Sequence, residues 1–106
     1  MKDEKNVKIS QLNQIYGGIL TEKQRAVLER FYDCDCSLAE ISEEFGISRQ
    51  AVLDAVKKSE ETLLKTEEKL GFLSVKQKLR DCVKELEKSP SNAKKIIEEM
   101  STILEM

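Results

Sequence analysis

The sequence contains no histidine and no tryptophan, and it has only one proline and four glycines among its 106 residues. Without histidine the chain lacks both the commonest general base and the commonest metal ligand, so catalytic triads that depend on histidine are excluded. Aromatic residues make up only 5% of the chain, which argues against a β-sandwich or a β-barrel. A composition with 36% charged residues and few turn-forming residues is typical of an ordered, helix-rich protein.

The three cysteines do not form a pattern that is typical of a metal or redox site. Cys34 and Cys36 are separated by one residue, and Cys82 lies far away in the sequence. Zinc sites and thioredoxin-like motifs need other spacings, so we expect free thiols, no metal and no cofactor. No apolar segment is long enough for a signal peptide or a membrane span, and we therefore expect a cytoplasmic location.

The length and the charge of the chain limit its organisation and its partners. A chain of 106 residues is close to the common size of one domain, and a single hydrophobic core of this size can be stable without disulfides or metals. The formal net charge is −2 and the isoelectric point is about 5.3, so the overall charge does not favour nucleic-acid binding. A small basic face on an acidic molecule would still be compatible with it.

Apolar residues recur at spacings of three and four along almost the whole chain, which predicts six helices and no sheet. Two helices should begin with capping boxes, in which a hydroxyl accepts a backbone N–H and a side chain three positions later reaches back. Thr21 with Gln24 and Ser37 with Glu40 have this spacing. The apolar stripes of the first two helices consist of Ile9, Leu12, Tyr16 and Ile19, followed by Val27, Leu28, Phe31 and Tyr32.

A long helix is predicted for residues 49–70, and Gly71 should end it. Two shorter helices should follow this glycine. Ser74 with Gln77 predicts a third capping box at the start of the first of them. Pro90 marks the start of the second, because proline is favoured at the first position of a helix.

Gly71 is also the expected joint between a first unit of residues 1–70 and a two-helix extension of residues 71–106. The last helix of the extension carries an apolar stripe that is too long to remain exposed to water. We expect the extension to pack on the first unit and to give one compact domain overall. Pairing of the stripe with a second copy in a homodimer is the alternative. The stripe consists of Ile96, Ile97, Met100, Ile103 and Leu104.

Residues 37–58, SLAEISEEFGISRQAVLDAVKK, carry the most informative pattern in the chain. A short helix should end at Gly46, a turn should follow, and a second helix should begin at Arg49 after the N-cap Ser48. This is the arrangement of a helix-turn-helix motif, whose tight turn needs a residue that adopts the left-handed conformation. A plain helical corner is the alternative. Small and apolar residues stand where the two helices would cross, at Ile41, Ser42, Phe45, Ile47, Val52 and Ala55.

In a helix-turn-helix motif the second helix reads DNA, and the N-terminus of that helix attracts phosphate. Arg49 suits the O6 and N7 atoms of guanine, and Gln50 suits the N6 and N7 atoms of adenine. Asp54 would repel phosphate on the same face, so an ordinary solvated helix surface is the alternative. Gly46 is the turn residue. The serine and the lysines among the candidates would contact phosphate. The candidate DNA-binding residues are Ser48, Arg49, Gln50, Leu53, Asp54, Lys57 and Lys58. We expect no catalytic and no metal-binding residue.

The segment TEKQRAVLERFYDCDCSLAEISEEFGISRQAV resembles region 4 of bacterial sigma-70 factors, in which a helix-turn-helix follows a helix of similar spacing. More closely, LTEKQRAVLERFY and SLAEISEEFGISRQAVLDAVKKSEETLLKTEEKLG are similar to the YlxM family, over about residues 9–106. That family consists of small DNA-binding or regulatory proteins of Gram-positive bacteria and their relatives. The resemblance implies an all-α, sigma region 4-like helix-turn-helix bundle with a long recognition helix and a two-helix C-terminal extension. It also implies a role in the signal recognition particle pathway, with the protein component of that particle as a partner.

The sequence departs from sigma region 4 in two respects. Ala51 and Leu53 occupy positions of the recognition helix that are often arginine in that region. The loss of two such contacts weakens both the reading of bases and the attraction to phosphate. Region 4 also ends soon after its recognition helix, whereas this chain continues for two more helices.

Two functions of different classes are compatible with these patterns. The first is a regulator that binds duplex DNA through residues 37–58. The second is a modulator of the signal recognition particle GTPase that keeps the helix-turn-helix as a scaffold, and the acidic balance of the chain favours it. An enzyme is not expected, because neighbouring glutamates such as Glu43 and Glu44 point about 100° apart on a helix and no phosphate-binding loop is present.

Overall fold

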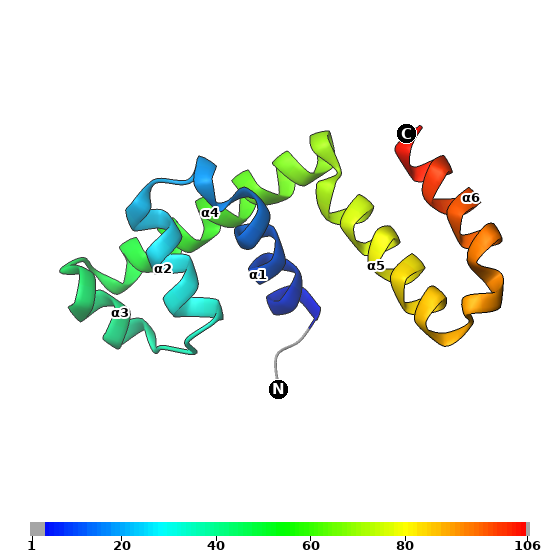
Figure 1. The fold of residues 1–106 in the computed structure, drawn as a ribbon. Helices are drawn as coiled ribbons and strands as arrows, with labels where there is room; N and C mark the ends of the chain where they lie inside the picture. The colour runs from blue at the N-terminus through cyan, green and yellow to red at the C-terminus, as the bar shows by residue number, and fades with distance from the viewer. Residues whose placement is uncertain (1–3, 106) are drawn as a thin grey trace. The chain divides into compact units, whose positions relative to one another are not determined.

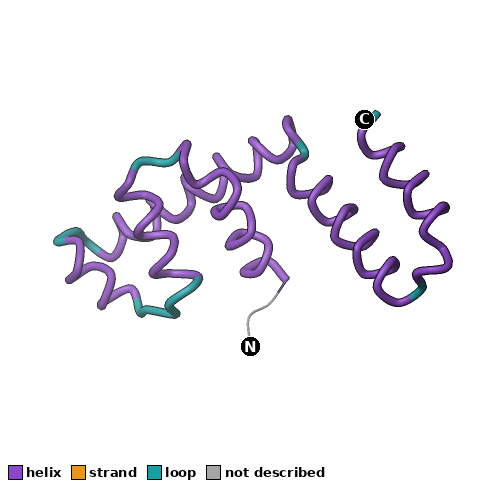
Figure 2. Tube along the Cα trace, viewed as in Figure 1, coloured by secondary structure: helices purple, strands orange, loops and turns teal. Residues whose placement is uncertain are grey.

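The computed structural model describes residues 4–105, which form six α-helices and no strand (Figure 1). Short loops and two 3₁₀ turns connect the helices (Figure 2). The predicted all-α fold is therefore confirmed. In chain order the elements are α1 (Glu4–Tyr16), η1 (Gly17–Ile19), α2 (Glu22–Tyr32), α3 (Leu38–Phe45), α4 (Arg49–Leu70), α5 (Phe72–Lys88), η2 (Pro90–Asn92) and α6 (Ala93–Leu104).

The chain divides into two compact units, one that ends at Leu70 and one that begins at Gly71. In the first unit, α1, α2 and α3 all pack against α4, and α2 also packs against α1 and α3. The second unit is a hairpin in which α5 packs against α6. The long helix α4 is therefore the element that holds the first unit together.

Side-chain caps start α2 and α3, as the sequence predicts. The Thr21 hydroxyl accepts the Gln24 backbone N–H at 3.1 Å, and the Gln24 side chain accepts the Thr21 backbone N–H at 3.1 Å. Ser37 and Glu40 form the same reciprocal pair, also at 3.1 Å. The bond from the Ser37 backbone N–H stabilises the charged Glu40 carboxylate and lowers the pKa of Glu40. Both capping boxes are confirmed, and each fixes the start of a helix that packs on α4.

The turn between α3 and α4 depends on Gly46, whose backbone has the left-handed angles φ 64° and ψ 36°. Two hydrogen bonds tie the turn to the end of α3. The Ile47 N–H donates to the Ser42 carbonyl oxygen at 3.1 Å, and the Ser42 hydroxyl donates to the Ile47 carbonyl oxygen. The Ser48 hydroxyl then accepts the Ala51 N–H at 3.0 Å and caps α4. The predicted tight turn at this glycine is confirmed.

The core of the first unit lies between α4 and the three helices that precede it. On α4 the buried side chains are spaced by three or four residues, which places them on one face of the helix. The expectation that Ile19 belongs to the buried stripe of α1 is wrong. Ile19 is 57% exposed because the chain leaves α1 at Gly17, and Leu20 is buried instead. The buried residues of α4 are Val52, Val56, Ser59 and Leu63, and the other buried apolar residues are Ile9, Leu12, Tyr16, Leu20, Val27, Leu28, Tyr32 and Ile41.

Two buried tyrosines connect α1 and α2 to α4 through hydrogen bonds of their hydroxyl groups. The Tyr16 hydroxyl, at the end of α1, donates to Glu67 at 2.7 Å. The Tyr32 hydroxyl, at the end of α2, donates to the Glu60 carboxylate. Each aromatic ring is buried while its hydroxyl finds a polar partner, which is the usual arrangement for tyrosine at the edge of a core. These bonds add directional contacts to the apolar packing on α4.

The hairpin of the second unit begins earlier than the sequence predicts. Its first helix, α5, starts at Phe72 directly after Gly71, which has the left-handed φ of 68°. The third capping box, expected at Ser74 and Gln77, is therefore wrong, because Ser74 lies inside the helix rather than at its N-terminus. Pro90 does open the next helical segment, but it begins the short turn η2 ahead of α6.

Few side chains of the hairpin are buried. They are Leu73 and Cys82 on α5 and Ile96 on α6. In the apolar stripe of α6, Ile97 is 60% exposed and Leu104 is 83% exposed. One edge of the stripe that the sequence identifies therefore faces solvent.

Replacing Gly46 should destabilise the protein through backbone strain alone. We expect Gly46→Ala to lower the free energy of unfolding by about 1–2 kcal/mol, and Gly46→Val by more, because side chains disfavour positive φ. An added Cβ meets no atom within 4 Å, so the loss would not come from a clash. Urea unfolding followed by circular dichroism measures the difference.

Gly18→Ala is the matched control for this prediction. Its added Cβ also meets no atom within 4 Å, and its φ is not positive. We expect it to change the free energy of unfolding by less than about 0.5 kcal/mol. Equal losses at Gly18 and Gly46 would contradict the role of the left-handed turn.

Candidate nucleic-acid interface

The candidate residues lie in about the first three turns of α4, on the side of the helix that faces away from the core. Val52 and Val56 point into the core, so the positions on the opposite side of the helix point outward. We call this outward side, with the cap that precedes it, the recognition surface. All seven candidates are exposed, namely Ser48, Arg49, Gln50, Leu53, Asp54, Lys57 and Lys58.

Ser48 prepares the N-terminus of α4 to meet an anion. Its hydroxyl oxygen accepts the Ala51 N–H at 3.0 Å, which satisfies one of the free N–H groups at the start of the helix. The hydroxyl hydrogen stays available as a donor. The remaining free N–H groups and the positive end of the helix dipole favour a phosphate at this position.

Gln50 and Asp54 are joined by a hydrogen bond on the recognition surface. The Gln50 side-chain N–H donates to Asp54 Oδ1 at 3.0 Å, one turn further along α4. This bond occupies a donor that Gln50 would offer to adenine, and the Asp54 carboxylate opposes phosphate. The sequence pattern points to both residues but not to their bond, although pairs four residues apart commonly interact on helices.

Leu53 lies among these polar residues and is 40% exposed. An exposed leucine at this place cannot donate or accept a hydrogen bond, but it can contact the methyl group of thymine. Its neighbour along the surface, Lys57, carries a long flexible chain and an ammonium group suited to phosphate. The recognition surface therefore combines one apolar contact, one amide and a few cations.

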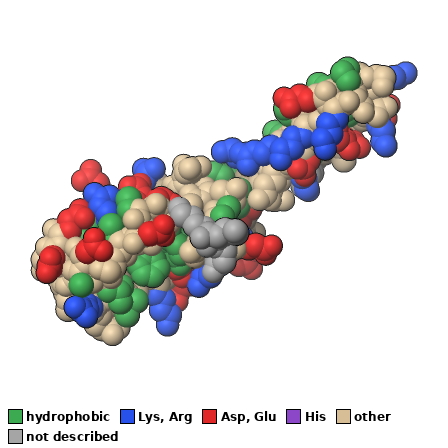
Figure 3. Space-filling model, turned by 90° about the horizontal axis from the view of Figure 1, so that it is seen from below, with side chains coloured by type: hydrophobic (Ala, Val, Ile, Leu, Met, Phe, Trp, Pro, Cys, Tyr) green, Lys and Arg blue, Asp and Glu red, His purple; other side chains and the backbone are tan. Residues whose placement is uncertain are grey.

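Basic residues occupy only part of the recognition surface. Arg49 stands at its start, and Lys57 and Lys58 stand at its end, with the Asp54 carboxylate between them. Beyond the lysines, exposed Glu61 adds negative charge to α4. Figure 3 shows one face of the molecule, on which acidic and basic side chains are interspersed. Attraction to phosphate would thus depend on three side chains and the helix N-terminus, so we expect modest and salt-sensitive affinity.

An ion pair that the sequence pattern does not indicate restrains α3, the helix before the turn. Arg30 Nε donates to Glu44 Oε1 at 3.1 Å and to Oε2 at 3.2 Å. The hydrogen bond to Glu44 raises the pKa of the Arg30 guanidinium. Both side chains are partly exposed, so the pair adds little to stability, but it links α2 to the end of α3.

Glu60 on α4 lies in the contact with α2, in the turn of helix that follows the recognition surface. It accepts the Tyr32 hydroxyl, and Lys5 Nζ lies 3.8 Å from its Oε2 atom. The Glu60 side chain is only 15% exposed. Burial raises the pKa of Glu60, although the charge of Lys5 acts in the opposite direction. The charged form of Glu60 is therefore less favourable in the folded protein than in the unfolded chain.

The three cysteines are free and have different surroundings. Cys34 is exposed, Cys36 is half-buried and Cys82 is buried. Desolvation raises the pKa of the Cys36 and Cys82 thiols, and nearby acidic groups add to this effect. Within residues 4–105, no group of three or more cysteine, aspartate or glutamate side chains is placed to hold a metal ion. In the same part of the chain, no helix is both long and apolar enough to cross a membrane.

Comparison with known proteins points to the same motif. Residues 3–103 match the UPF0122 family, described as "Putative helix-turn-helix protein, YlxM / p13 like". A UPF0122 protein of Bacillus cereus strain AH187 is 39% identical over 102 residues, which cover 96% of this chain and 93% of that protein. A UPF0122 protein of Bacillus anthracis strain A0248 has the same identity and coverage. A UPF0122 protein of Desulforamulus reducens is 49% identical over 67 residues, which cover 63% of this chain and 57% of that protein.

Glu60→Gln should change how stability depends on pH. Because the pKa of Glu60 is raised in the folded state, its contribution to stability is present below the ordinary glutamate pKa and is lost as the pH rises through the raised value. Glutamine keeps an acceptor for the Tyr32 hydroxyl and does not ionise. The variant should therefore gain stability relative to wild type between about pH 4 and pH 7 in urea unfolding.

Glu68→Gln is the matched control, because Glu68 is exposed on the same helix and does not contribute to the raised pKa of Glu60, whereas the charge of Glu61 does. It removes the same charge from the chain without changing the contact with α2. We expect its stability relative to wild type to stay nearly constant over this pH range. The same trend in both variants would show that net charge, and not the burial of Glu60, causes the effect.

Proposed function

The chain belongs to the UPF0122 family of YlxM / p13-like helix-turn-helix proteins, as its sequence resemblance predicts, and we propose that it is a regulator that binds duplex DNA through α4. The observation that carries this proposal is that all seven candidate residues are exposed, one on the cap and six on α4, directly after a left-handed turn at Gly46. In DNA-binding helix-turn-helix proteins, the second helix lies in the major groove in this way.

Each part of the recognition surface has a separate task in this proposal. Ser48 and the free N–H groups of α4 bind one phosphate, and Lys57 with Lys58 binds phosphates further along the backbone. Arg49 donates two hydrogen bonds to guanine. Gln50 reads adenine once it has left the Asp54 carboxylate, so sequence-specific binding costs the energy of that bond.

The second candidate function is that of a protein-binding modulator in the signal recognition particle pathway. The observation that favours it is the placement of Asp54 among the candidate contacts, where a carboxylate opposes DNA but suits a basic protein surface. The link to this pathway comes from the family resemblance, and the GTPase of the particle is the partner that the resemblance suggests. In both candidate functions the protein acts by binding and not by catalysis.

Removing the side chains of Arg49 and Gln50 should weaken DNA binding strongly. We expect wild type to bind pooled genomic duplex fragments with an affinity that falls steeply between about 50 and 200 mM salt. Arg49→Ala/Gln50→Ala should weaken this binding by at least about tenfold, because it removes one cation and both base-reading groups. Fluorescence anisotropy of labelled duplexes measures both effects.

Gln77→Ala/Lys78→Ala is the matched control, since it removes one amide and one cation from neighbouring exposed positions of α5. Its DNA affinity should stay within about twofold of wild type. No binding by wild type at tens of micromolar would contradict the DNA-binding proposal. Direct binding to the purified signal recognition particle GTPase would then support the second candidate.

Asp54→Asn should strengthen DNA binding. The substitution removes a negative charge from the recognition surface, and asparagine still offers an oxygen to Gln50. We expect affinity to rise on the order of threefold at low salt, with a smaller gain at high salt because ions screen the repulsion. Asp81→Asn, at an exposed position of α5, should leave the affinity unchanged. Weaker binding by Asp54→Asn would mean that the carboxylate itself contacts the DNA.

A further inference from the structure

The hairpin of α5 and α6 exposes a set of large apolar side chains that the proposed DNA-binding function does not use. On α5, Phe72 is 56% exposed, Val83 is 50% exposed and Leu86 is 40% exposed. On α6, Ile97 is 60% exposed and Leu104 is 83% exposed. Isolated exposed apolar residues are common, but a contiguous set marks an interaction surface.

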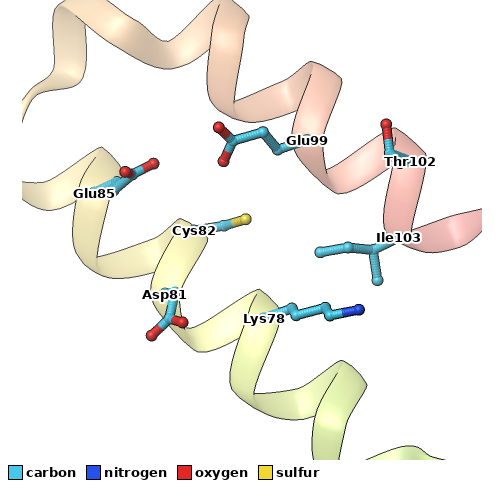
Figure 4. Close-up of a pocket in the computed structure, with 7 residues that line it drawn as sticks. All are labelled: Lys78, Asp81, Cys82, Glu85, Glu99, Thr102 and Ile103. Atoms are coloured by element: carbon cyan, nitrogen blue, oxygen red, sulfur yellow. The ribbon is translucent and has the colours of Figure 1, made fainter.

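These residues lie on one side of the hairpin. Cys82 on α5 and Ile96 on α6 are buried between the two helices, and Figure 4 shows Cys82 pointing from α5 toward α6. Asp81 precedes Cys82 and Val83 follows it, so these two residues point to opposite sides of α5. By the same geometry, Ile97 lies on the side of Val83. We call this side the apolar face.

The opposite side of the hairpin is polar. It carries a groove of about 340 Å³ between α5 and α6. The residues that line the groove are Lys78, Asp81, Cys82, Glu85, Glu99, Thr102 and Ile103 (Figure 4). Four of these side chains are charged, whereas Val83, Ile97 and Leu104 on the apolar face carry no charge.

The small core of the hairpin is a reason for the apolar face to be covered. Folded units of fewer than about 40 residues usually need a disulfide, a metal or association to be stable. The described part of the hairpin has three buried apolar side chains, and its one cysteine is free. Burial of Val83, Ile97 and Leu104 would enlarge this core, as happens when two helical hairpins pack into a four-helix bundle.

Charges beside the apolar face identify a second copy of the chain as the partner. Lys78 and Ile103 line one hollow of the hairpin, and Glu85 and Ile96 line another, so each of these pairs lies at about the same level along the two antiparallel helices. If two hairpins pack with their twofold axis along the bundle, α5 of one copy lies beside α6 of the other in this same register. Three pairs of opposite charge then meet, namely Lys76 with the partner's Glu105, Lys84 with the partner's Glu98, and Glu87 with the partner's Lys94.

We propose that the apolar face of the α5–α6 hairpin binds the same face of a second copy and forms a homodimeric four-helix bundle. Each of the six paired residues is exposed in the single chain and is therefore available for these contacts. The interface is isologous, so every contact occurs twice. It shares no residue with the recognition surface of α4, so the dimer can be tested independently of DNA binding.

Sedimentation velocity of the full chain across the micromolar range tests the dimer. We expect wild type to change from monomer to dimer as its concentration rises. Ile97→Glu should raise the dissociation constant by at least about tenfold, because it places a charge in the centre of the interface. Ile19→Glu is the matched control, since Ile19 is exposed to nearly the same extent, 57% against 60%, and lies in the first unit. It should dimerise like wild type.

A charge exchange tests the arrangement without changing any apolar residue. Lys84→Glu should weaken the dimer by repulsion from the partner's Glu98, and Lys84→Glu/Glu98→Lys should restore it. Both positions are exposed, so these variants should keep the helical circular-dichroism spectrum of wild type. This pair of variants remains informative even if Ile97→Glu fails to fold.

Three results would overturn the proposal. A wild type that stays monomeric at all concentrations would mean that the apolar face is covered within its own chain or by another protein. A dimer that Ile97→Glu leaves intact would use a different surface. A dimer that Lys84→Glu weakens but Lys84→Glu/Glu98→Lys does not restore would lack the proposed pairing of α5 with α6.

Discussion

The buried face of α4 is the constraint on which the rest of the first unit depends. Three helices pack against it, and Tyr16 and Tyr32 bind it through their hydroxyl groups. Because Val52 and Val56 must point into this core, Leu53 and Asp54 between them have to point outward. The same packing that stabilises the fold therefore also presents the recognition surface. The Gly46 turn sets the place at which this helix begins and so connects stability to the proposed function.

Electrostatics limit how strongly the recognition surface can attract phosphate. The net charge of the protein is −2, and its recognition surface holds a carboxylate between its cations. Gln50 donates a hydrogen bond to that carboxylate at 3.0 Å, so one of the groups proposed to read bases already has a partner in the protein. If the protein binds DNA as proposed, such an arrangement would lower its non-specific affinity, because phosphate attraction supplies most of that affinity. In the proposed function, specificity would then come from the few partners that displace Asp54 from Gln50.

Much of the fold could be predicted because its signals are local. Thr21, Ser37 and Gly46 act on residues at most five positions away, so their spacing in the sequence is sufficient. The exposure of Ile19 could not be predicted, because it depends on where the chain leaves α1 and which side chain then meets the core. The exposed side of α4 follows from the helical period, but the bond between Gln50 and its neighbour depends on one rotamer among several. Periodicity identifies an apolar stripe on α6 without showing which of its edges a partner covers.

The most direct test of the recognition surface is a nuclear magnetic resonance titration of isotope-labelled protein with duplex DNA. Amide chemical shifts report binding residue by residue, so they distinguish contacts of α4 from contacts of the other helices. The account predicts that the largest shift changes fall at residues 47–58 and that the amides of α5 and α6 change little. Changes confined to other helices, or no change with excess duplex, would contradict the assignment of α4 as the helix that reads DNA.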